Sequence, residues 1–454
     1  MGFIYGLAVL LVIFEGIIIQ CEGAGDDIIE GPPILPNDVK NLILSKTDME
    51  TMQKAARGKI VLTNDIIMSR ILPDHIVQIM PQVPKSGIFE NYKLGDLFLV
   101  ICGNAKVRKF FDKFGDRVKK IEIWYMKYKF HINKSIIERY AKNLEELRIN
   151  TEDDEWLWEK FSDGEKNIIF PEVKKLQFIG HSKQRVLNLN FIFPKLESFK
   201  LDGDVADANC LAYVKGLKEL ALRAETIHEG HLDHIFKNNK EMTKIFLSEP
   251  RKAETMRSIA KYLTKLETLQ VEYPGENFMM RKNNSMVYIL ASVTHFDAKI
   301  DERIPFGNFS IDMPRLEKLT LNTVEPDDRF VDFIKQFKLL KIVAFSVMNS
   351  NAVECFEKLK HIREFTISFY GNQCVTGKQF NLLKEIFENF DITDELQTLK
   401  FVNFKVSKYQ FYEDKMNRIN NHLESIMKPK WTLSHGTQID TFENYLMLKR
   451  EPWT

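Results

Sequence analysis

One short pattern recurs along the chain and constrains its fold more than any other feature. An apolar residue is followed by two variable residues, a second apolar residue, one variable residue and a third apolar residue, as in Leu316, Leu319 and Leu321 of PRLEKLTLN (314–322). Twelve copies can be placed, spaced 21 to 34 residues apart and mostly 23 to 27. They begin at Val118, Leu144, Val173, Leu196, Leu217, Met242, Leu266, Val293, Leu316, Leu339, Ile362 and Leu396. A fixed period in this range indicates a solenoid.

Each copy ends on alternating apolar residues, the pattern of a β-strand with one buried face. A helical pattern precedes most copies. In DDRFVDFIKQF (327–337), Phe330, Phe333, Ile334 and Phe337 share one helical face. Further helices are expected in ADANCLAYVKG (206–216), AETMRSIAKYLTK (253–265), NSMVYILASV (284–293) and NAVECFEKLKH (351–361). Because one strand and one helix cannot bury their apolar sides alone, the units must stack.

These repeats resemble the leucine-rich repeat family in its long, helix-bearing subtype, over about residues 118–435. The resemblance implies an α/β horseshoe with parallel strands inside and helices outside. The family usually carries Asn two or three residues beyond the motif, whereas Asp204, Pro274, Val324 and Phe404 stand there in this chain. We therefore assign residues 116–435 to the solenoid. Within them we expect a helix over 408–427 and a final strand in KWTLSHG (430–436), followed by a C-terminal tail over 436–454.

The N-terminus carries an apolar run from Phe3 to Ile19, interrupted by Glu15 and followed by small residues near Gly23. This pattern predicts a signal peptide over residues 1–23 and a secreted protein or one of the secretory pathway. An uncleaved anchor and a buried N-terminal helix are the alternatives. The five cysteines form no C-x-x-C pair and favour a reducing compartment, so cytoplasm or nucleus remains an alternative location.

Residues 24–65 are expected to be a linker and helical lead-in, and residues 66–115 a small helical region. IIMSRILPDHIVQIM (66–80) and LGDLFLVICGNAKVRKFF (94–111) resemble the F-box that precedes the repeats of insect-type F-box/leucine-rich repeat proteins. The matching residues are Leu72, Pro73, Asp74, Ile76, Ile79, Met80, Leu94, Asp96, Leu97, Ile101 and Cys102. The resemblance implies docking to a ubiquitin-ligase scaffold. The alternative is a plain helical cap of the first repeat.

Charge and motifs argue against most other functions. With 64 basic and 63 acidic residues the net charge is +1, so nucleic acid is a poor default partner. No phosphate loop or nucleophile motif is present, and no cofactor is expected. A metal-dependent hydrolase would rest on His228, His231 and His234. Leu232 stands where the second histidine of H-E-x-x-H would be, so we expect a solvated loop and helix start rather than a metal site.

The variable positions of the motif remain as the candidate site. Both signs of charge interleave there, which suits a polar protein interface. The selected residues are Glu145, Arg148, Lys175, Gln177, Lys200, Lys218, Lys244, Phe246, Gln270, Lys318, Thr320 and Arg363. Phe246 would be an exposed aromatic, a residue type favoured as an interface anchor. The sequence therefore predicts a non-enzymatic protein that binds another protein through the inner face of its sheet.

Overall fold

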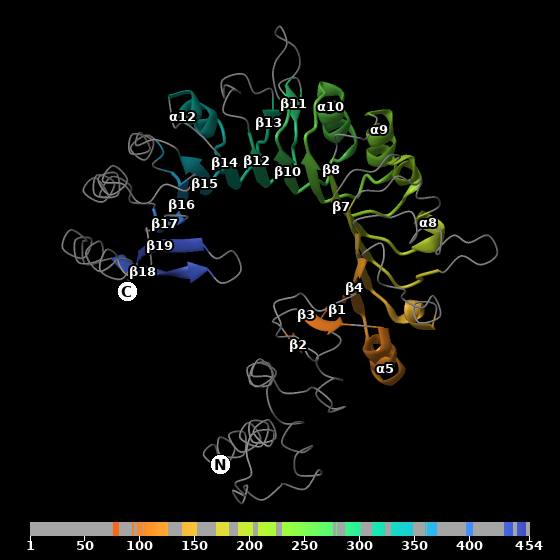
Figure 1. Cartoon of the computed structure of the whole chain (residues 1–454). Helices are drawn as coiled ribbons and strands as arrows, with labels where there is room; N and C mark the ends of the chain where they lie inside the picture. Colours follow the sequence, from red (N-terminus) through yellow and green to blue (C-terminus); the bar gives the residue numbers. More distant parts are fainter. Residues whose placement is uncertain are drawn as a thin grey trace, which may run out of the picture. The chain divides into compact units, whose positions relative to one another are not determined.

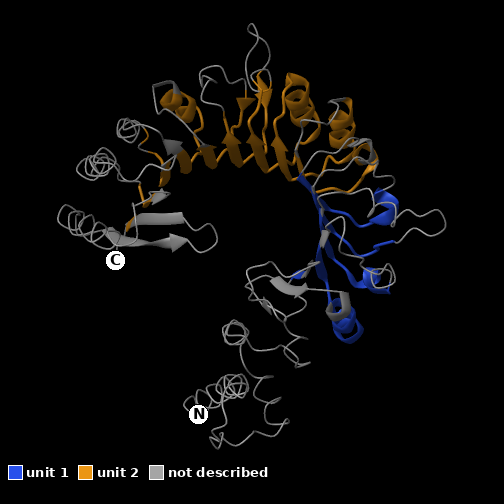
Figure 2. Ribbon diagram, in the orientation of Figure 1, with its two compact units in different colours: residues 1–210 blue, residues 211–454 orange. Residues whose placement is uncertain are grey.

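The fold is described from a computed structural model of the chain, which divides into two compact units, residues 1–210 and 211–454 (Figure 2). The structure describes residues 76–80, 93–94, 98–102, 104–125, 139–151, 169–180, 189–202, 208–223, 229–275, 278, 287–300, 311–322, 328–347, 359, 361–369, 396–402, 431–438 and 443–450. The expected signal peptide, the linker over 24–65 and the helix over 408–427 lie outside these residues. In the described part, no helix is both long enough and apolar enough to cross a membrane.

The first unit is built on one parallel sheet (Figure 1). Its parallel strands, in spatial order, are β3 (Phe98–Cys102), β1 (Ile76–Met80), β4 (Lys120–Tyr125), β5 (Glu146–Thr151), β6 (Lys175–Gly180) and β7 (Ser198–Asp202). The short strand β2 (Lys93–Leu94) runs antiparallel to β3. The order is sequential from β4 onward, whereas β1 lies between β3 and β4.

The expectation of helices across the F-box-like segment is therefore wrong for its core residues. Ile76 and Ile79 lie in β1, and Cys102 lies in β3. Val77 of β1 is in register with Ile121 of β4, so this segment extends the sheet of the repeats. A short apolar run is compatible with either a strand or a buried helix, and periodicity alone does not separate the two. The helical expectation holds for α5 (Asn104–Phe114). The other matched residues that lie outside the described residues are Leu72, Pro73, Asp74, Asp96 and Leu97.

The second unit continues the same pattern. Its parallel strands are β8 (Glu219–Arg223), β9 (Lys244–Ser248), β10 (Thr268–Glu272), β12 (His295–Lys299), β14 (Lys318–Asn322), β15 (Ile342–Val347), β16 (Glu364–Phe369) and β17 (Thr398–Val402). A hairpin follows them: β19 (Glu443–Arg450) pairs antiparallel with β17 and with β18 (Trp431–Gln438). The strand expected in residues 430–436 is confirmed, whereas the expected tail contains a further strand of this sheet.

In the second unit the helices all lie on one side of the strands, the side that carries the buried apolar positions (Figure 1). They are α9 (Glu229–Asn238), α10 (Ala253–Tyr262) and α12 (Asp328–Lys335); the first unit also carries the one-turn α8 (Leu189–Ile192). Two expected helices are wrong: residues 208–213 form a 3₁₀ helix, and Tyr288–Ile289 form the short strand β11, parallel to β13 (Ile311–Asp312). Parallel strands with backing helices in register make this an α/β leucine-rich repeat solenoid.

The apolar positions of the motif form the core. Leu220, Leu269 and Leu319 are each no more than 2% exposed, and the corresponding residues of the other coils are buried in the same way. Phenylalanines fill the space between strands and helices, as where the Phe330 and Phe345 rings meet edge to face with centroids 5.4 Å apart. Each coil thus buries its strand face only because its neighbours are present.

In the copies that the structure describes, a buried position lies three residues ahead of the motif, and it was not recognised from the sequence. The first apolar residue of a copy donates its N–H to the carbonyl of this residue, as from Leu266 to Leu263 at 3.1 Å and from Leu316 to Met313 at 3.0 Å. This turn carries the chain from the back of the solenoid into the strand. The sequence signal is present, because the position is apolar in most copies, for example in Phe170 and Phe193.

One copy differs by one residue from its expected register. Leu339 and Ile342 were assigned to the motif, but Leu339 is 49% exposed, whereas Leu340 is 1% exposed and Val343 is fully buried. Val343 is the strand partner of Leu319. Two adjacent leucines made both registers plausible in sequence, and a shift of one residue turns every side chain of a strand to the opposite face.

Asn239 is the least exposed of the few polar residues that are buried in the described part of the chain. It stands at the turn position ahead of Met242 and is 2% exposed. Its Oδ1 accepts from the N–H of Leu217 at 2.9 Å, and its Nδ2 donates to the carbonyls of Val214 at 2.7 Å and Ile235 at 2.9 Å. The turn before Leu217 is open, and the left-handed Gly216 (φ 88°) lies within it. The amide therefore satisfies two backbone groups of the preceding coil.

The register of β15 can be tested by a matched pair of substitutions. Leu340→Ala should lower the free energy of unfolding by about 2–5 kcal/mol, because it opens a cavity in the core. Leu339→Ala should change it by no more than about 0.5 kcal/mol. Urea unfolding of the full chain, followed by circular dichroism, measures both. Equal effects, or a larger effect at Leu339, would contradict the register.

The amide of Asn239 is expected to be a major contributor to local stability. Asn239→Leu removes three hydrogen bonds and leaves the buried N–H of Leu217 unpaired, so the free energy of unfolding should fall by about 2–4 kcal/mol. The neighbouring exposed Lys240→Ala is the control and should be close to neutral. Hydrogen exchange at the Leu217 amide should accelerate in Asn239→Leu; protection equal to wild type would contradict the assigned bond.

Candidate functional site

The open face of the sheet, meaning the strand side opposite the buried apolar positions, carries the candidate site. Alternation along each strand points the second and third variable positions of the motif toward this face, whereas the first variable position, as in Glu145, Lys218 and Arg363, stands just before its strand. The structure exposes Glu145, Lys175, Lys200, Lys218, Lys244, Lys318 and Arg363, and it leaves Arg148, Gln177, Phe246, Gln270 and Thr320 half-buried. Arg148, Gln177 and Lys200 are register partners on β5, β6 and β7, and Phe246 is the partner of Gln270.

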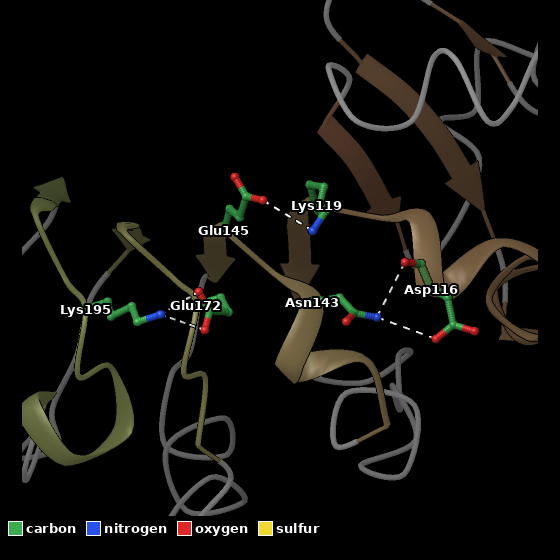
Figure 3. A network of polar contacts seen from close by, with 6 residues as sticks. All are labelled: Asp116, Lys119, Asn143, Glu145, Glu172 and Lys195. Atoms are coloured by element: carbon green, nitrogen blue, oxygen red, sulfur yellow. Dashed lines mark hydrogen bonds and ion pairs between the residues drawn. The ribbon is translucent and has the colours of Figure 1, made fainter.

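In the first unit two of the selected charged residues, Arg148 and Glu145, already have an ion-pair partner. The Nε of Arg148 donates to Oε1 of Glu146 at 2.7 Å on the same strand. The Nζ of Lys119, just before β4, lies 3.3 Å from Oε1 of Glu145, just before β5 (Figure 3). Ion pairs within the unit reduce what these charged groups can offer to a partner.

A second row of polar contacts lies just before the strands and also joins successive coils (Figure 3). Lys195 donates to both carboxylate oxygens of Glu172, at 2.7 and 2.8 Å, and this bond lowers the pKa of the Glu172 carboxyl. Asn143 lies 3.5 Å from Oδ1 of Asp116 in the same row. Exposed pairs of this kind contribute little to stability. They are contacts between coils rather than a binding site.

The second unit presents a different central row. Along β9, β10, β12 and β14, the successive register partners are Phe246, Gln270, Asp297 and Thr320, all half-buried. The Nε2 of Gln270 donates to Oδ2 of Asp297 at 3.1 Å. Burial raises the pKa of the Asp297 carboxyl, and the bond from Gln270 only partly opposes that effect. The face therefore holds an aromatic ring, an amide and a partly desolvated carboxylate side by side.

At the ends of β9 and β10 the backbone takes a conformation that side chains rarely adopt. Glu249 (φ 54°) and Tyr273 (φ 48°) are left-handed, and each is followed by proline. The N–H of Glu249 donates to the carbonyl of Glu272 at 2.6 Å, and the N–H of Tyr273 donates to the carbonyl of Lys299 at 2.7 Å. Each such residue costs about 1 kcal/mol or more, and such outliers cluster at functional sites. We call Glu249, Glu272, Tyr273 and Lys299 the rim.

Charged groups at the rim are paired. Glu272 forms an ion pair with Lys299, and its hydrogen bond raises the pKa of the Lys299 ammonium. The Nη2 of Arg251 lies 3.7 Å from Oε2 of Glu249. Tyr273 is 53% exposed, so its ring remains accessible beside these pairs.

The histidine segment shows no metal site in the part of the chain that the structure describes. No group of three His, Cys, Asp or Glu side chains there could hold an ion. His231 and His234 lie on α9, and Asp233 between them accepts from Oγ of Ser258 at 2.6 Å. His228 lies outside the described residues.

Asp297, Tyr273, Glu272 and Lys299 were not selected from the sequence. The copy containing Asp297 is weak, because the small Ala298 occupies its third apolar position. Counting one residue back from Val271 and from Ala298 aligns Asp297 with Gln270, so that signal was available. The left-handed turn at Tyr273 could not be read from the sequence, because Glu-Pro and Tyr-Pro do not specify it.

Comparison with known proteins supplies no name for this fold. No protein-family model matches the chain, and no curated protein matches it. Among solved structures, the crystal structure of a TLR13–ssRNA13 complex is similar, with a TM-score of 0.31 and 12% sequence identity. The match covers 69% of this chain and 50% of that chain, so this chain spans about half of its length. So distant a likeness carries no argument about function, and the strand register described above is what establishes the solenoid.

Proposed function

We propose that this protein is a non-enzymatic binding protein that recognises another protein through the open face of its second unit. The observation that carries the proposal is the row Phe246, Gln270, Asp297 and Thr320, held in register by a continuous apolar core. A rigid scaffold lowers the entropy lost on binding, because the contacting groups are already in place.

The balance of residue types in this row supports a protein partner. Phe246 offers apolar area, Gln270 and Thr320 offer hydrogen bonds, and Asp297 offers one charge. Interfaces between proteins combine an aromatic centre with polar surroundings of this kind. The exposed Lys244 and Lys318 flank the row, and in the described part of the chain neither has an ion pair within 4 Å.

The proposal can be tested by comparing variants of one coil. Full-length chain is immobilised and exposed to extract from its source, and retained proteins are quantified. Phe246→Ala and Lys244→Glu on β9 should each weaken binding of a specific partner, at least about tenfold for Phe246→Ala. Lys237→Glu, the same charge change on the back of that coil in α9, should leave the affinity unchanged. A partner lost equally from all three variants would contradict recognition by the open face.

For the compartment, we propose entry into the secretory pathway, supported by the apolar run from Phe3 to Ile19 and the small residues after it. N-terminal sequencing of the protein purified from its natural source should give a start near Ala24. A start at Met1 or Gly2 would instead favour cytoplasm or nucleus.

The ubiquitin-ligase alternative is not favoured by the geometry of its own segment. β1 and β3 engage their backbones in the sheet, and β1 pairs with both β3 and β4. A helical docking module would need residues 76–80 as a helix. The metal-dependent enzyme rests on the three histidines alone, and no described geometry favours it.

A further inference from the structure

We infer that the open face of the second unit recognises an arginine side chain of its protein partner, with Asp297 as the anchoring carboxylate and Phe246 and Tyr273 as its aromatic flanks. The inference rests on the proposed function and specifies the chemistry of the partner. Its three residues lie on neighbouring coils, on β9, β12 and the end of β10.

Charge complementarity is the first argument. Of the carboxylates gathered here, Glu249 is paired with Arg251 and Glu272 with Lys299. Asp297 has a hydrogen bond from the neutral Gln270, and among the described residues it has no ion pair within 4 Å. Lys299 and Lys318 act on the Asp297 carboxylate only from beyond that distance. A half-buried carboxylate without a direct ion pair has lost hydration that a partner's cation would restore. Burial raising the pKa of Asp297 agrees with this deficit.

The aromatic residues favour arginine over lysine. Phe246 lies two strands from Asp297, a separation of about 10 Å. Tyr273 is 53% exposed at the end of the strand between them. A guanidinium is planar, so it binds a carboxylate through two N–H groups and also stacks on aromatic rings. An ammonium binds a carboxylate only as a point charge.

The left-handed backbone at Tyr273 supports a binding role for its ring. The bond from its N–H to the carbonyl of Lys299 fixes the backbone at the rim. Glycine would adopt this conformation without a steric cost. A bulky tyrosine at such a position indicates that its ring is retained for contact rather than for folding.

Linear peptides displayed on phage provide the test. Peptides are selected on immobilised full-length chain and remade with fluorescein for anisotropy titrations. Selected peptides should share an arginine, and replacing it by citrulline, its uncharged isostere, should weaken binding at least about tenfold. Asp297→Asn, which keeps the size of the side chain and can still accept from Gln270, should weaken the arginine peptide and abolish the difference between arginine and citrulline.

Matched controls separate the two proposals. Tyr273→Gly should lower peptide affinity without lowering the melting temperature, whereas Tyr213→Gly, the same change at an exposed tyrosine of the 3₁₀ helix over 208–213, should leave the affinity unchanged. Peptides that depend on Phe246 but bind Asp297→Asn and wild type equally would overturn the arginine anchor and leave protein binding intact. If no selected peptide depends on Phe246, Lys244 or Asp297, both proposals fail. Tighter binding of single-stranded RNA than of any peptide, lost in Lys244→Glu, would also overturn both.

Discussion

The burial of three apolar side chains per coil against the same three of its neighbours is the interaction on which the rest of the structure depends. Strand alternation places these residues on one side of the sheet, where Leu220, Leu269 and Leu319 are all but inaccessible to water. Because every coil uses the same positions, the opposite side is repeated as well. The variable residues therefore form rows across the strands. The strand register, rather than the local loop structure, decides which of them are neighbours.

Much of this architecture could be predicted from the sequence, because period and alternation are properties of the sequence itself. The helix containing Phe330 and Phe333 and the strand register of most coils follow directly from the pattern. Where the pattern was ambiguous, the prediction was wrong. Neighbouring leucines allowed two registers at Leu340, and the short run at Ile76 fits a strand as well as a helix.

The site was predicted less completely, for a physical reason. Sequence pattern identifies which side chains face the open side, but it does not show which charges are already satisfied. Arg148 and Glu145 were selected as binding residues, yet each already has an ion-pair partner in its own unit. Asp297 was overlooked, although its half-buried carboxylate, unlike the side chains of Arg148 and Glu145, has no ion pair within 4 Å among the described residues. That distinction depends on distances between coils and on burial, neither of which is encoded locally.

The hairpin at the end of the second unit has a consequence for how such a chain can change in length. β19 hydrogen-bonds to β17 in the antiparallel sense, in the place where a further parallel coil would dock. Duplication of a coil beyond β17 would displace that hairpin. A repeat is therefore inserted or lost most easily between two existing coils, because both neighbours then present the parallel strand edge that a coil needs. Related chains of different length should accordingly differ in the middle of the array and keep the last two strands.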